Sequence, residues 1–363
     1  MRRFRFVGPL ALSLLIACSE SFLPASFVTD LRVVGARVEV EGAPGRANPS
    51  PGDDIEVSML VIDQGVLPER LPKESPLTPP PLTWAFVACV PRATRVGSPI
   101  CGARIKPCDG CTGPPPTDPL AFPVIGFQVP SEEELEAAQA DGVVLQRVVC
   151  VYGVPSTDAI TRFLLGETDD RQLCEADPAD PPDPEDPDPK PEPEGRFVTV
   201  QIPIERDAEN PNLNPGIADV RLNGQSWPPP YNEGVPRDAL GSGCAAELTG
   251  EERARHPVAG SAPSTINLAV TADSLQSFTV DDVSVTEEIQ VSWLADGGGF
   301  EVSFSFITEP ASSILTQWQP FPEAPVDGLL VRFNFVIRDG RGGTDWVERG
   351  LCVLPEPLSA SPP

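Results

Sequence analysis

The stretch Val331-Arg-Phe-Asn-Phe-Val-Ile-Arg-Asp-Gly-Arg-Gly-Gly-Thr-Asp345 decides how the C-terminal half of the chain folds. Apolar and polar side chains alternate along its first half, which is typical of a half-buried strand. A run of Asp and Gly follows, and Gly340, Gly342 and Gly343 permit the positive φ that a tight turn between antiparallel strands requires. A second alternating stretch comes after the turn, at 346–354. The sequence therefore predicts a β-hairpin.

The rest of the C-terminal half repeats this alternating pattern. Ile289, Val291 and Trp293 share one face, so we expect Trp293 to fill the space between two packed sheets. Over about 65 residues from Glu288, the pattern resembles the closing strands of PKD- or cadherin-like β-sandwiches. The resemblance implies an antiparallel sandwich over residues 217–355. Its strands are expected at 217–222, 266–270, 289–293, 300–306, 329–338 and 346–354.

The N-terminal half carries another set of short strands. Trp84 lies on a central one and Cys150 on a late one, and this order resembles an immunoglobulin-like sandwich over residues 27–206. Extra cysteines and two helical insertions depart from the antibody pattern. The strands are expected at 27–34, 37–40, 55–62, 82–89, 143–152 and 197–204.

Two helices and one low-complexity segment interrupt this half. The capping box Ser131-Glu-Glu-Glu134 predicts a helix to about residue 140, and a second helix is expected at 156–165. Residues 175–195 hold nine acids, eight prolines and a single lysine, so they have too little apolar surface to fold. We expect a disordered loop that projects from the first sandwich, because the strand at 197–204 should close that same sandwich. An inter-domain linker is the alternative.

The predicted fold class is therefore mainly β, with two antiparallel immunoglobulin-like sandwiches, short helical insertions and a disordered acidic Pro-rich loop. The linker between the sandwiches is expected at 207–216, which is rich in turn-forming residues. Residues 356–363 are expected to form a flexible tail.

The N-terminus has the order of a secretory signal. Arg2, Arg3 and Arg5 precede an apolar run at 7–16. At ~1.5 Å per residue, this run is about half as long as the hydrocarbon layer is thick, so it does not span a membrane. It ends on Leu15-Ile-Ala-Cys18, which resembles the lipobox of bacterial lipoproteins.

The lipobox resemblance implies that residues 1–17 are removed and that Cys18 is acylated and becomes the new N-terminus. Two or more acyl chains anchor stably, because each buried methylene contributes ~0.8 kcal/mol. Ser19, where an Asp would suggest inner-membrane retention, favours the outer membrane. The protein is then exported and held on the periplasmic or cell-surface side by a lipidated tether at 18–26. An ordinary cleaved signal with a chance cysteine is the alternative.

Acidic residues dominate the mature chain. The full sequence holds 53 Asp and Glu against 26 Lys and Arg, and its formal net charge of −27 becomes −30 when residues 1–17 and their three arginines are removed. Such a surface repels phosphate backbones and anionic headgroups, so no nucleic acid partner is expected. The expected partners are the membrane, through the lipid anchor, and an envelope protein or polysaccharide. The oligomeric state stays open.

The nine cysteines leave eight once Cys18 is lipidated, and an even number in an exported protein is typical of a disulfide set. Cys244 and Cys352 are alone in the second sandwich, so we expect them to pair. The other six allow fifteen pairings, among which the sequence does not choose. Cys108 and Cys111 have the Cys-x-x-Cys spacing of zinc ligands, but the motif occurs once and no histidine is near. The six are Cys89, Cys101, Cys108, Cys111, Cys150 and Cys174.

Groups for covalent catalysis are scarce. The single histidine, His256, lies in a polar stretch before a proline, and no Gly-x-Ser-x-Gly elbow is present. Gly297–Gly299 follow an expected strand as a hairpin turn, which is not the context of a phosphate-binding loop. We therefore expect that the protein is not an enzyme. A hydrolase with two carboxylates stays an alternative, since 53 acids always supply candidate pairs.

Calcium is the metal that the sequence favours most. Asp296, Asp339 and Asp345 lie in glycine-rich turns of the second sandwich, and calcium prefers hard oxygen ligands. However, no Asp-x-Asp-x-Asp loop gathers them, and Asp and Gly also favour turns for conformational reasons. No other cofactor is expected. The predicted function is a non-catalytic binding or structural module at the cell envelope, with a calcium-dependent adhesive module as the alternative.

Overall fold

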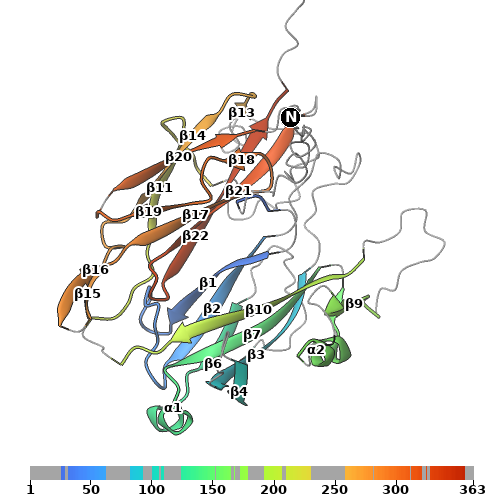
Figure 1. The fold of residues 1–363 in the computed structure, drawn as a ribbon, viewed down its shortest axis with the longest axis vertical. Coiled ribbons are helices and arrows are strands. Elements are labelled where there is room, and N and C mark those ends of the chain that lie inside the picture. The colour runs from blue at the N-terminus through green and yellow to red at the C-terminus, as the bar shows by residue number, and fades with distance from the viewer. Residues whose placement is uncertain are drawn as a thin grey trace, which may run out of the picture.

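Figure 1 shows the computed structural model of the chain, in which strands account for most of the described residues. The predicted fold class, mainly β with antiparallel immunoglobulin-like sandwiches, is confirmed. The described residues are 26–28, 32–62, 82–92, 100–105, 108–109, 124–151, 153–164, 167, 172–178, 192–206, 210–229, 258–280, 282–310, 312–320, 324 and 328–355.

The first sandwich consists of two four-stranded sheets, in the orders β1-β2-β6-β5 and β10-β7-β3-β4. Numbered along the chain, these are the A-B-E-D and G-F-C-C′ sheets of an immunoglobulin-like sandwich. A two-stranded ladder, β8-β9, stands apart. The strands are β1 (Arg32–Val40), β2 (Asp54–Ile62), β3 (Leu82–Arg92), β4 (Ile100–Arg104), β5 (Cys108–Asp109), β6 (Val124–Gln128), β7 (Gly142–Val151), β8 (Val154–Pro155), β9 (Cys174–Glu175) and β10 (Glu194–Pro203).

The second sandwich repeats this arrangement. Its sheets have the orders β12-β11-β14-β20-β18 and β13-β22-β21-β17-β19, so β11, β14 and β20 correspond to A, B and E, and β22, β21, β17 and β19 to G, F, C and C′. The strands are β11 (Ile217–Leu222), β12 (Gln225–Ser226), β13 (Val258–Ala259), β14 (Ser264–Val270), β15 (Ser277–Val280), β16 (Val283–Thr286), β17 (Ile289–Ala295), β18 (Gly299–Phe300), β19 (Phe304–Ile307), β20 (Ser313–Gln319), β21 (Leu329–Arg338) and β22 (Thr344–Val353).

Trp293 lies between the two sheets of the second sandwich and is fully buried, so this prediction is confirmed. Its ring meets that of Phe335 edge-on, with 5.3 Å between the centroids. Its indole N–H donates to the Ser305 hydroxyl at 2.9 Å. The polar atom of this large side chain is therefore satisfied within an apolar core.

The predicted hairpin is the pair β21–β22, and a carboxylate organises its turn. Asp339 Oδ1 accepts from the amides of Arg341, Gly342 and Gly343 at 2.7, 3.0 and 2.9 Å. Gly340 and Gly342 have φ of 79° and 125°, in the range that favours glycine. Gly343 has no such φ; it is needed because a Cβ there would collide with Asp339 Oδ2.

Both helical insertions form. α1 (Glu132–Ala138) begins at the predicted capping box, in which Ser131 Oγ accepts from the Glu134 amide and the Glu134 carboxylate accepts from the Ser131 amide. α2 (Thr157–Leu164) is the second insertion. It lies over the outer face of the sheet that contains β7, where Ile160 and Phe163 pack on Cys150 and its neighbours.

Among the described residues, two disulfides brace the first sandwich, and neither crosses its core. Cys89 pairs with Cys101 on the adjoining strand β4, and Cys150 pairs with Cys174 on β9. The antibody pattern would place a late cysteine such as Cys150 between the sheets. Here the alternation along β7 places Cys150 on the outer face, where it packs with Leu173.

The acidic stretch 175–195 begins and ends in the first sandwich. Glu175 pairs with Val154, and the stretch runs into β10, which pairs with β7. Residues 179–191 lie outside the described residues. A linker between the sandwiches would need its two ends in different sandwiches, and this stretch does not have them.

The first described residues differ from expectation. The sequence predicts a strand of the first sandwich at 27–34, whereas β1 begins at Arg32. Residues 26–28 instead pair with the second sandwich, where Phe27 bridges Ala295 in parallel. The N-terminal segment therefore adds to the edge of β17.

Candidate functional site

Several of the residues expected to carry function lie outside the described residues, among them Cys18, Cys111 and Cys244. Cys352 is fully buried on β22 and is disulfide-bonded. Its pairing with Cys244 stays a prediction. Cys108 lies on the short strand β5, opposite β6.

The disulfides indicate an extracellular or periplasmic protein, because cytosolic thiols are kept reduced. In the part of the chain that the structure describes, no helix has the length and apolar character needed to cross a membrane.

The three aspartates considered for calcium do not form a common site. Asp296 accepts from the backbone N–H and the guanidinium of Arg332, each at 2.7 Å. Asp345 accepts from Arg37 of the first sandwich at 2.6 Å. Asp339 accepts the turn amides described above, and burial raises its pKa. Within the described ranges, no group of three or more His, Cys, Asp or Glu is placed to hold a metal ion.

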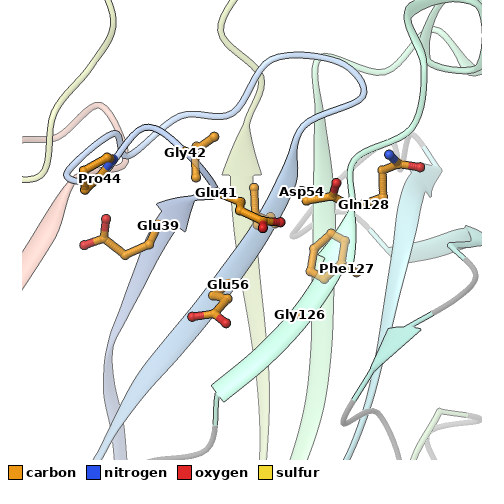
Figure 2. A pocket seen from close by; sticks show the side chains of 11 residues that line it. Glu39, Glu41, Gly42, Pro44, Asp54, Glu56, Gly126, Phe127 and Gln128 are labelled. Atoms are coloured by element: carbon orange, nitrogen blue, oxygen red, sulfur yellow. The ribbon is translucent and has the colours of Figure 1, made fainter.

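A groove of about 690 Å³ opens over the first sandwich. Figure 2 shows that its side chains come from β1, the turn that follows it, β2 and β6. Glu39 and Glu56 lie directly opposite each other in the β1–β2 register, and like charges in such a pair are destabilising. The acidic lining residues are Glu39, Glu41, Asp54 and Glu56, and the apolar ones include Val40, Ile55 and Phe127.

The groove offers negative charge from carboxylates. Glu39 is already held, since it accepts from Arg37 Nε and from the Gly45 amide, each at 2.7 Å. Among the described residues that line the groove there is no Ser, Thr, Cys, His or Lys, so the ionisable side chains of the lining are all carboxylates. The arrangement can attract a cationic group at the surface.

An apolar cluster joins the two sandwiches. β1 lies close to β22 because Gly35 has no side chain: a Cβ there would be 3.3 Å from the Trp346 ring. Around this contact, side chains of β2 pack against side chains of β17 and β21. The cluster consists of Val28, Leu60, Ile62, Leu294 and Val336, with Val34 and Trp346 packed against it.

Two arginines extend this junction. Arg37 of β1 pairs with Asp345 of β22, and both side chains are about three-quarters buried. Arg338 donates to the Ser292 hydroxyl at 3.0 Å within the second sandwich and to the Val34 carbonyl in the first. Burial lowers the pKa of Arg338. The outer face of the β21–β17 sheet is thus tied to β1 by charged groups as well as apolar ones.

Arg341, in the turn between β21 and β22, bridges the sandwiches at a second point. Its guanidinium lies 3.5 Å from the Glu205 carboxylate of the first sandwich and 2.8 Å from that of Glu287 in the second. It also stacks over the Phe278 ring, 4.4 Å from the centroid. The Glu287 side chain is fully buried, and this burial raises its pKa.

Residues 210–216, which we call the strap, fasten to both sandwiches. Asn212 is fully buried, and its carbonyl accepts from the Ala47 amide at 2.8 Å. Its side-chain amide donates to Asp339 Oδ2 at 3.0 Å. One residue therefore connects the first sandwich to the hairpin turn of the second.

Asn214 does the same two residues later. It donates to the Val38 carbonyl at 2.7 Å and accepts from the Thr344 amide at 3.0 Å. The sequence predicts a linker here because Asn and Pro favour turns. The sequence signal for the strap's contacts is the Asn at every second position from 210 to 214, because this spacing directs Asn212 and Asn214 to one side.

Comparisons with known proteins leave the family open. No protein-family model matches the chain, and no curated protein matches it. The crystal structure of the periplasmic chaperone SfaE is similar at 7% identity and a TM-score of 0.21, over 29% of this chain and 56% of the chaperone. A marsupial T cell receptor is similar at 7% identity and a TM-score of 0.18, over 91% of this chain and 76% of the receptor. TM-scores this low do not establish a fold, so the fold is assigned from the order of the strands in each sheet.

Proposed function

We propose that the protein is a lipoprotein of the bacterial outer membrane, anchored through Cys18, and that it acts as a rigid, non-catalytic binding or structural module at the cell envelope. The Leu15-Ile-Ala-Cys18 motif supports the anchor. The disulfides support an exported protein. The junction between the sandwiches supports the rigid module.

The observation that carries this proposal is the place of residues 26–28. Ala295 donates to the Ser26 carbonyl and Val28 donates to the Ala295 carbonyl, both at 3.0 Å. Phe27 and Val28 are buried, and Val28 belongs to the apolar cluster that joins the sandwiches. An anchor on Cys18 would therefore hold both sandwiches at their junction, which suits a module that presents its surfaces in a fixed orientation.

The anchor is tested by producing the full chain in a bacterial host that processes lipoproteins. We expect radiolabelled palmitate in the wild-type protein and none in a Cys18→Ala variant. Mass spectrometry of the mature wild-type protein should find residues 1–17 absent and acyl chains on residue 18. An intact Met1 or an unmodified thiol at position 18 would overturn the anchor.

The binding role is tested by cross-linking the lipidated protein in intact envelopes. We expect an envelope protein or polysaccharide to be captured by the wild type and lost in Cys18→Ala. Hydrolysis of a panel of glycosides and esters by the purified protein, abolished by Glu56→Gln in the acidic groove, would contradict a non-catalytic role.

A further inference from the structure

Strand β19, at the edge of its sheet, exposes two phenylalanines. Phe304 is 54% exposed and Phe306 is 46% exposed, and their rings contact edge-on with 5.7 Å between the centroids. Val302, just before the strand, is 42% exposed. Within the described residues β19 pairs with β17 alone (Figure 1). Neighbouring large apolar side chains on a free sheet edge mark an interaction surface.

This edge lies where the N-terminal segment joins the fold. Along one edge of β17, the Trp293 amide donates to the Ser303 carbonyl, and the Ala295 amide donates to the Ser26 carbonyl. These donors are two residues apart on one strand, so the two acceptors are separated by about 7 Å. The chain thus enters the second sandwich at Ser26, beside the start of β19.

The length of chain before Ser26 limits how far this edge can be from the anchor. Eight residues, 18–25, precede it, and they span at most about 28 Å when fully extended. If Cys18 carries acyl chains, the bilayer surface stays within that distance of Ser26. Phe304 then meets lipid at a high effective concentration, whereas a protein partner would have to be recruited.

We propose that Val302, Phe304 and Phe306 form a membrane-contacting edge that inserts into the headgroup and upper acyl region of the bilayer that holds the lipid of Cys18. This inference rests on the proposed lipidation. Aromatic and aliphatic side chains are favoured at that depth. Glu301 and Glu309 flank the strand and are exposed, so the edge suits zwitterionic headgroups, while the acidic body is repelled by anionic ones.

The test is photo-cross-linking from the lipidated full chain in vesicles of phosphatidylethanolamine and phosphatidylcholine. Benzoyl-phenylalanine replaces Phe304 in one sample and Phe306 in a second, both exposed positions that tolerate a larger ring. The matched control is the same group at Leu315, which is 62% exposed on β20 of the opposite sheet. We expect phospholipid adducts from 304 and 306 in at least about fivefold greater yield than from 315, with the yield reduced by added phosphatidylglycerol.

Mass spectrometry of Cys18 in the same samples separates the two proposals. If Cys18 is acylated but positions 304 and 306 give no more lipid adduct than 315, the membrane-contacting edge is wrong and the anchor stands. Adducts to a second copy of the chain or to another protein's strand in place of lipid would also overturn it. A Cys18 without acyl chains would overturn both.

Discussion

At the scale of single residues, Arg147 lies in an unfavourable environment. It is 1% exposed on the core face of β7, and its Nη1 lies 2.6 Å from the Met59 sulfur, a weak acceptor. Among the described residues, its Nε and Nη2 have no hydrogen-bond partner, and the Trp84 ring lies 5.7 Å from Cζ. Burial lowers the pKa of Arg147 to about 9. A buried cation without a carboxylate costs stability.

We expect Arg147→Met to stabilise the protein by about 1–4 kcal/mol at pH 7, because an apolar side chain of similar length replaces the buried charge. The gain should shrink above pH 9. Between the folded pKa of about 9 and the higher pKa of the unfolded chain, the folded wild type loses its proton while the unfolded chain keeps it, so wild-type stability rises with pH. Urea denaturation at pH 7 and pH 10 measures both effects. A less stable variant at pH 7 would contradict this account of Arg147.

Trp293, in contrast, is a large buried side chain whose polar atom has a hydrogen-bond partner. We expect Trp293→Ala to lower the free energy of unfolding by about 3–5 kcal/mol, since it leaves a cavity between the sheets. Leu315→Ala, on the surface, should change it by less than about 0.5 kcal/mol. Denaturant melts of both variants provide the comparison. A loss under about 1 kcal/mol for Trp293→Ala would mean that the core closes around the gap.

At the scale of elements, the β21–β22 turn depends on the Asp339 carboxylate, which satisfies three amides and the buried Asn212 side chain. We expect Asp339→Ala to cost about 2–4 kcal/mol, because it leaves these donors without partners. Asp339→Asn keeps one acceptor oxygen and should cost less. Thermal melts rank the two variants, and an equal loss in both would show that charge, rather than turn geometry, is what matters.

Elements that depend on local pattern could be predicted from the sequence. The strand Ile55–Ile62, the capping box at Ser131 and the hairpin after Val331 follow from alternation, side-chain capping and turn glycines, all of which act over a few residues. The strap and the pairing of Phe27 with Ala295 could not be predicted, because they depend on where distant strands lie. The same holds for the disulfide partners. It also holds for Arg147, because the alternation along β7 is the only signal that places this cation in the core.

At the scale of the whole molecule, the junction makes the sandwiches one mechanical unit. Arg341 contributes most through Glu287, whose carboxylate has no exposure of its own. We expect Arg341→Ala to lower stability by about 2–4 kcal/mol, because it leaves that carboxylate buried and unpaired, and to broaden the unfolding transition as the sandwiches separate. Arg221→Ala, which breaks the exposed pair with Asp219, is the control and should cost less than about 1 kcal/mol. Calorimetry of both variants tests this, and equal losses would contradict it.

The central claim is that the chain leaving the anchor is part of the fold at the junction of the sandwiches. Amide hydrogen exchange of the lipidated, full-length protein tests this most directly, at Val28 and Ala295. Because the two amides take part in one pair of hydrogen bonds, we expect both to be protected to the same degree and to exchange together. Exchange of Val28 at the rate of an unstructured peptide, with Ala295 still protected by its neighbours, would contradict the claim.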